Sequence, residues 1–126
     1  MQLEIQPTFL AICRLESHSL IPSWAFLGEF FSISKSSDEL SIVCNQENIP
    51  EEVKAERDWR CLKVQGPLDF GLTGILASLA TPLAAAHISI FALSTFDTDY
   101  LLVKQQNFEE ALQVLSQAGH QIIFPR

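Results

Sequence analysis

The sequence predicts an α+β protein in which short strands alternate with a few helices. Apolar runs of strand length recur along the chain, two apolar faces with helical spacing occur in the second half, and one hairpin pattern occurs twice. The 126 residues include 48% hydrophobic and 18% charged residues, which is the composition of a packed globular protein. This length allows one compact domain or two small units that share a core.

The beginning of the chain is predicted to be extended. Leu3 to Gln6 alternates apolar and polar residues, Pro7 interrupts, and Phe9 to Leu15 is an apolar run. Two consecutive strand segments or one broken strand are therefore expected. The next stretch, Leu20 to Leu27, contains a proline and is too short for more than a helical turn or two.

A hairpin and a short helix are expected to complete the first half. Phe30 to Ser34 and Leu40 to Cys44 are rich in aromatic or β-branched residues and are joined by a polar connection, as in a β-hairpin. Pro50, followed by two glutamates, is typical of a first helical turn. The pattern predicts a helix over residues 50–57.

The second half reads as strand, helix, strand, strand, helix, strand. Trp59 to Val64 is the first strand, and Asp69 in the turn after it is a candidate cap for the next helix. Pro82 should kink that helix. Its apolar face is predicted to contribute to the core and consists of Leu72, Ile75, Leu76, Leu79, Leu83 and Ala86.

Two more strands and a second helix follow. Ile88 to Leu93 and Tyr100 to Val103 are predicted strands around a polar turn. Apolar residues at helical spacing from Phe108 to Leu115 predict a helix that Gly119 should terminate. Gln121 to Phe124 is predicted to be the last strand.

Charge and hydropathy exclude several classes of partner. The net charge of −7 and the lack of any run of Lys or Arg argue against binding to nucleic acid or to a membrane surface. The most apolar stretch, Leu72 to Leu93, is interrupted by too many polar residues to span a bilayer. Because no basic segment precedes an apolar run at the N-terminus, no signal peptide is expected and a cytoplasmic protein is predicted.

No cysteine or histidine lies at a spacing typical of a metal site or of a catalytic nucleophile and base. These residues are Cys13, Cys44, Cys61, His18, His87 and His120. The cysteines are interpreted as small buried thiols and the histidines as structural. We therefore expect no metal, no cofactor and no catalytic activity.

An internal repeat divides the chain. A shift of 60 residues places Phe31–Ser34 over Phe91–Ser94 and Leu40–Gln46 over Tyr100–Gln106. The two predicted helices that follow also align when a gap of two residues is allowed. The pattern indicates two copies of one motif, residues 1–58 and 59–126. The first copy is abbreviated, because a short interrupted segment stands where the second copy has a long helix.

The strings Gly66–Leu76 and Ile88–Tyr100, together with Asp38–Cys44, resemble the small tandem ACT proteins of bacteria. Those proteins are related to aspartate kinase regulatory domains and to the eukaryotic cytosolic arginine sensors. The resemblance implies ferredoxin-like βαββαβ units that act in pairs, with effectors bound where two units meet. Either Trp59–Val64 or Leu3–Gln6 could complete the first unit, and a shared or exchanged strand is expected.

The resemblance also implies a ligand site. It combines the turn between the first strand and first helix with the second strand of a neighbouring unit. In this sequence the turn is Asp69, Phe70, Gly71, Leu72, Thr73 and Gly74, and the strand end is Ser94, Thr95, Phe96, Asp97 and Asp99.

These residue types suit an amino acid. Amides at the start of the helix can receive a carboxylate, and glycines allow a ligand to approach the backbone. Asp97 or Asp99 could pair with an ammonium or guanidinium group. Structural roles remain open: Asp69 as a helix cap, Gly71 and Gly74 as sites of close packing, and Asp97 as a turn former.

Two functions remain open from the sequence. The first is an amino-acid sensor, a homodimer whose effector favours one arrangement of the ACT units and thereby changes binding to a regulated protein partner. The second is a structural assembly module that binds no effector. The glycines and the helix start in the Gly66–Gly74 loop favour the sensor.

Overall fold

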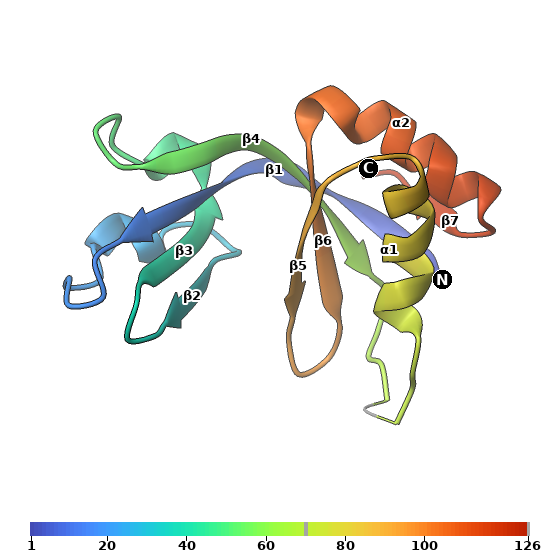
Figure 1. Cartoon of the computed structure of the whole chain (residues 1–126), viewed down its shortest axis with the longest axis horizontal. Helices are drawn as coiled ribbons and strands as arrows, with labels where there is room; N and C mark the ends of the chain where they lie inside the picture. The colour runs from blue at the N-terminus through green and yellow to red at the C-terminus, as the bar shows by residue number, and fades with distance from the viewer. Residues whose placement is uncertain (70, 126) are drawn as a thin grey trace. The chain divides into compact units, whose positions relative to one another are not determined.

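The computed structural model describes residues 1–69 and 71–125 and confirms an α+β fold (Figure 1). The chain divides into two compact units. The first unit is Thr8–Trp59, and the second unit consists of Met1–Pro7 together with Arg60–Arg126. Among the residues described, no helix is long and apolar enough to cross a membrane.

Strand β1 runs without interruption from Gln2 to Leu15, where the sequence predicted two segments or one broken strand. Its beginning pairs in parallel with β7 (Gln121–Ile123), and its end pairs antiparallel with β3 (Leu40–Asn45). Pro7 lies between these two regions, at the boundary of the two units. A proline donates no hydrogen bond to a sheet, so it is tolerated where a strand changes partners.

The N-terminal residues belong to the second unit, whereas the sequence division placed residues 1–58 together. Leu3 and Ile5 are buried in the core of the second unit, and their burial explains this grouping. Strand β4 (Ala55–Val64) is divided in the same way, with its beginning in the first unit and its end in the second. Both long strands therefore contribute to both units.

The second unit has the predicted order of elements. After β4 come α1 (Ile75–Ala85), β5 (Ile90–Ser94), β6 (Asp99–Lys104), α2 (Gln105–Gln117) and β7. Its strands lie in the order β7-β1-β4-β6-β5, and Figure 1 shows α1 and α2 next to each other. Gly119, with φ of +100°, follows the end of α2 as predicted. The core is formed by Leu3, Ile5, Leu62, Val64, Leu79, Leu83, Ile88, Leu101, Val103, Phe108, Ala111 and Leu115.

Pro82 lies inside α1 and cannot donate the helical hydrogen bond to the carbonyl of Ser78. The structure supplies another donor, because Nε2 of His120 lies 3.1 Å from that carbonyl oxygen. His120 follows α2, so this contact links the segment after α2 to a carbonyl inside α1.

A double-mutant cycle tests this compensation. His120→Ala should lower the free energy of unfolding by about 1 kcal/mol, since the Ser78 carbonyl loses its donor. In a Pro82→Ala background, the restored backbone N–H of residue 82 can donate to the Ser78 carbonyl. There, His120→Ala should lower the free energy of unfolding by clearly less. Urea denaturation of the four proteins measures the difference. An equal cost in both backgrounds would contradict the compensation.

The first unit contains no α-helix among its residues, all of which are described. It consists of parts of β1 and β4, the hairpin β2 (Ser32–Lys35) and β3, and two short 3-10 helices, η1 (Ser23–Phe26) and η2 (Gln46–Asn48). The turn of η1 agrees with the prediction for Leu20–Leu27. The core is formed by Ala11, Cys13, Ala25, Leu40, Ile42, Cys44 and Ile49.

The helix predicted over residues 50–57 is wrong. This stretch contains a turn from Pro50 to Val53, and β4 begins at Ala55. Side chains from Val53 to Trp59 alternate between more and less exposed positions, which is the period of a strand. An isolated helix of this length is unstable without an apolar face to pack, so the strand pairing prevails over the proline and glutamates.

Candidate functional site

One cavity in the second unit has a volume of about 320 Å³. It lies between the loop that joins β4 to α1 and the turn that joins β5 to β6. The residues around it are Leu68, Asp69, Leu72, Gly74, Ile75, Leu76, Ser94, Thr95, Phe96, Asp97, Thr98 and Asp99. Two segments that are separated by a whole helix in the sequence thus form the two sides of one site.

Hydrogen bonds join the loop to the turn. The backbone N–H of Leu68 donates to the carbonyl of Asp97 at 2.7 Å, and the hydroxyl of the buried Thr98 donates to the carbonyl of Val64. At Gly66 a Cβ atom would lie only 2.9 Å from the Asp97 carbonyl oxygen. This close approach of two backbones requires glycine.

The β5–β6 turn is also held internally. Thr95 N–H donates to the Thr98 carbonyl at 2.8 Å, and the Thr95 hydroxyl accepts from Thr98 N–H at 3.3 Å. The hydroxyl of Ser94 donates to Asp99 Oδ1 at 2.6 Å. The Asp99 carboxylate is therefore held in one orientation at the cavity.

The start of α1 differs from the prediction. Asp69 does not cap the helix, because the helix begins at Ile75 and its N-cap position is Gly74, with φ of +77°. Asp69 instead closes a turn, with Oδ1 accepting from Gly71 N–H at 2.7 Å. Among the described residues no side chain caps α1. A helix start leaves backbone N–H groups without helical partners, and this one, beside the cavity, can receive an anion.

Apolar side chains form part of the cavity wall. Leu72 and Leu76 were predicted to be core residues, but the structure leaves them 54% and 37% exposed. Leu72 precedes the helix, so its apparent helical spacing to Leu76 has no structural counterpart. Phe96 is 78% exposed at the tip of the opposite turn.

Eight of the eleven predicted ligand residues line the cavity. They are Asp69, Leu72, Gly74, Ser94, Thr95, Phe96, Asp97 and Asp99. Gly71 and Thr73 lie in the same loop but do not line the cavity, and Phe70 lies outside the described residues. The resemblance implied a strand end from a neighbouring unit, whereas the loop and the turn that line this cavity come from the same unit.

Sequence reasoning missed four lining residues: Leu68, Ile75, Leu76 and Thr98. Apolar residues in a helical pattern were interpreted as core, and only the observed helix start shows that Ile75 and Leu76 reach the cavity. Thr98 lies between two predicted aspartates, so its position in the turn was the signal that could have identified it.

The charges at the cavity are of one sign. Asp69, Asp97 and Asp99 contribute carboxylates, and the described lining residues include no Lys, Arg or His. Carboxylates near an apolar wall attract a cation more strongly than they do in open water. Together with the helix start, the site can accommodate a zwitterion that carries an additional positive charge.

The cysteines lie elsewhere, buried and unpaired by disulfides. Burial raises the pKa of the Cys61 thiol to about 12, so this thiol stays protonated at neutral pH. A hydrogen bond with Cys44, together with burial, also raises the pKa of Cys13. Within the described part of the chain, no group of three or more potential ligand residues could hold a metal ion.

Two family models match this chain. The model described as the ACT domain matches residues 54–117, which include the loop, the turn and both helices of the second unit. A model described as an N-terminal domain matches residues 9–52, within the first unit. The boundary between the two matches lies near the boundary of the two units at Trp59, although Met1–Pro7 of the second unit lies outside the ACT match.

Similar proteins include arginine sensors. The chain is 35% identical over 94 residues to the human protein named cytosolic arginine sensor for mTORC1 subunit 1, with 68% of this chain and 29% of that protein covered. The bovine protein of the same name is 30% identical over 99 residues, with 70% and 30% covered. The chain thus spans less than a third of the length of these relatives.

Similar solved structures cover the chain almost completely. A crystal structure of a protein from Agobacterium tumefaciens has 42% sequence identity and a TM-score of 0.94, and covers 99% of this chain and 93% of that one. The regulatory subunit of aspartate kinase from Thermus thermophilus has a TM-score of 0.61 at 11% identity, with 93% and 97% covered. At that identity the likeness concerns the fold alone.

Proposed function

Because the chain belongs to the ACT domain family, we propose that it is a regulatory protein whose amino-acid effector binds in the cavity of the second unit. The observation that carries the proposal is the pairing of two kinds of group around one cavity. Three carboxylates lie on its sides, and the start of α1, without a side-chain cap in the described part of the chain, lies beside it.

Each part of an amino acid then has a complementary partner. The α-carboxylate binds the free N–H groups at the start of α1, where the helix dipole favours a negative charge. Asp97 and Asp99 bind cationic groups through charge-assisted hydrogen bonds. Leu72, Leu76 and Phe96 contact the aliphatic part of the effector.

The effector class that fits best is an amino acid with a cationic side chain. The excess of carboxylates at the cavity favours a net positive ligand and disfavours glutamate or aspartate. The names of the human and bovine relatives, which refer to arginine sensing, support the same class.

A thermal-shift panel tests the proposal. Arginine and lysine should raise the melting temperature, because a ligand that binds only the folded state stabilises it by about 2.7 kcal/mol at a concentration of 100 Kd. Citrulline, which has the shape of arginine without the charge, should shift it much less, and glutamate should not shift it. The absence of any shift with all amino acids at millimolar concentration would contradict the proposed function.

We also propose that two copies of the chain pair through the side of the second unit that carries β5 and α1. β5 is at the end of the strand order and has one edge without a strand partner in the described sheet. Helix α1 contains no charged residue, and Ala77, Thr81 and Ala84 are exposed on it. A free sheet edge and an uncharged helix surface of small residues are each suited to cover by a symmetric copy.

Introducing a charge on α1 tests the pairing. Ala84→Glu should convert a homodimer into monomers, because burying an unpaired carboxylate in an interface is costly. Gln106→Glu, an exposed position on α2, is the matched control and should leave the mass unchanged. Light scattering at micromolar concentrations gives the mass. A monomeric wild type, or a dimeric Ala84→Glu protein, would contradict this interface.

The second candidate function is an assembly module that keeps the pairing but binds no effector. The same uncharged helix surface favours it. Dimers with no thermal shift in the panel would favour this function over the sensor. We propose no catalytic role for either; among the described residues that line the cavity, no histidine lies beside Ser94.

A further inference from the structure

The β2–β3 hairpin of the first unit repeats the β5–β6 hairpin of the second at a shift of 59 residues. Lys35 pairs with Leu40, just as Ser94 pairs with Asp99, so each hairpin has a four-residue turn. The shift of 60 from the sequence alignment is therefore one residue too long at the turn. At the structural shift, Asp38 corresponds to Asp97.

The two turns have the same internal hydrogen bonds. In the first unit, Ser36 N–H donates to the Glu39 carbonyl at 2.9 Å, and the Ser36 hydroxyl accepts from Glu39 N–H at 3.3 Å. Thr95 and Thr98 form the same two bonds in the second unit, at 2.8 and 3.3 Å. The turns are thus equivalent in conformation as well as in position.

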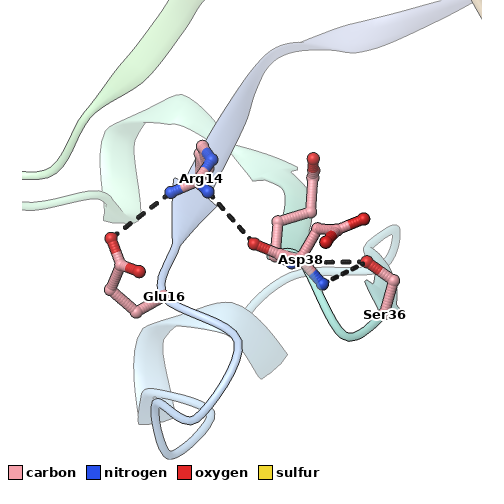
Figure 2. Close-up of polar contacts among 5 residues, drawn as sticks. Arg14, Glu16, Ser36 and Asp38 are labelled. Atoms are coloured by element: carbon pink, nitrogen blue, oxygen red, sulfur yellow. Dashed lines mark hydrogen bonds and ion pairs between the residues drawn. The ribbon is translucent and has the colours of Figure 1, made fainter.

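The two turns differ in the group outside the turn that donates a hydrogen bond to them. The carbonyl of Asp97 accepts from the backbone N–H of Leu68, in the β4–α1 loop. The carbonyl of Asp38 accepts instead from the Arg14 guanidinium, with Nη2 at 3.1 Å (Figure 2). Nη1 of Arg14 lies 3.4 Å from a carboxylate oxygen of Glu16. A side chain of β1 thus takes the place of the loop.

The first unit also lacks most of the groups that would bind an effector. Leu40, which is buried, stands where the second unit has Asp99, and Ser37 stands where it has Phe96. After β1 the chain forms only the four residues of η1, so no long helix starts beside this turn. Of Asp97 in the turn and Asp99 at the start of β6, only Asp97 has an acidic counterpart here, Asp38.

We infer that the first unit, where Arg14 holds the turn in place of the loop, has no counterpart of the effector cavity, so that each chain binds a single effector molecule, in the second unit. This inference rests on the proposed function for its second part. Arg14 acts here as a positioning residue, because its guanidinium fixes the turn through the Asp38 carbonyl. The pseudo-repeat in the sequence therefore does not produce a second site.

Titration calorimetry with arginine tests the number of sites. We expect one site per chain in the wild type. Asp97→Asn should weaken binding at least about tenfold, and its structural counterpart Asp38→Asn should leave both affinity and stoichiometry unchanged. Two sites per chain, one of them lost in Asp38→Asn, would overturn the inference while leaving the proposed function intact.

Hydrogen exchange tests the role of Arg14 without any effector. Arg14→Met should speed exchange of the Ser36 amide about tenfold, because the turn loses its outer contact, and should not change exchange of the Thr95 amide. Arg14→Lys keeps one charged donor and should restore part of the protection. Unchanged exchange at Ser36 in Arg14→Met would overturn the role of Arg14, and a lack of arginine binding would count only against the proposed function.

Discussion

Asp99→Asn is expected to reduce the thermal shift produced by arginine to half or less, while leaving the melting temperature of the free protein nearly unchanged. The substitution removes the negative charge that the Ser94 hydroxyl orients at the cavity. A hydrogen bond to a charged group contributes about 1.5–3 kcal/mol, which corresponds to roughly a ten- to hundredfold loss of affinity. The asparagine oxygen can still accept from Ser94, so the turn should persist.

Two further variants test whether the loss of binding is specific to the Asp99 carboxylate. Glu110→Gln, on the exposed surface of α2, removes a charge of the same sign away from the cavity and should bind arginine as the wild type does. Asp99→Ala removes the acceptor of Ser94 as well, so it should weaken both binding and the turn. A full thermal shift in Asp99→Asn would exclude Asp99 from the effector site.

Leu79→Ala is expected to give the largest loss of stability among these substitutions. Leu79 is fully buried on α1 in the core of the second unit, and truncation of such a residue costs about 2–5 kcal/mol through lost burial and the cavity that remains. Leu20→Ala is the control, since Leu20 is 92% exposed and should change stability by less than about 0.5 kcal/mol.

Urea denaturation of both variants, followed by circular dichroism, measures these changes in the free energy of unfolding. Similar losses in the two variants would contradict the assignment of the core. A small loss in Leu79→Ala alone would mean that the second unit is not stabilised by the packing of α1 on its sheet.

The spacing of apolar residues, together with turn residues and Gly119, was sufficient to predict most elements of the second unit. The strand from Trp59 to Val64, the two strands of the β5–β6 hairpin and the helix that Gly119 follows were each predicted from residues close together in sequence. The family resemblance also implied that residues of the β4–α1 loop and of the β5–β6 turn bind a ligand. Their assembly into one cavity within a single unit differs from the expected pairing of neighbouring units, and their role in binding stays a prediction.

Local patterns failed where two signals competed. Residues 50–57 carry a proline and glutamates typical of a helix start, but their side chains follow the period of β4. Asp69 has the residue type of a helix cap, but it closes its own turn with Gly71, and α1 begins later. In the first case strand pairing prevailed over the helix preference of the residues. In the second, formation of a turn prevailed over the preference of aspartate for the helix cap.

By itself the sequence determined the α+β class, the uncharged α1, the acidic character of the loop and turn, and the presence of a repeat. These properties depend on the identity and spacing of neighbouring residues. Only the tertiary structure decided that Met1–Pro7 joins the second unit and that Leu72 and Leu76 line a cavity. It also decided that Arg14 holds the Asp38 turn. The reason is that burial and hydrogen bonding between distant segments depend on which strands pair, and a linear pattern does not contain that information.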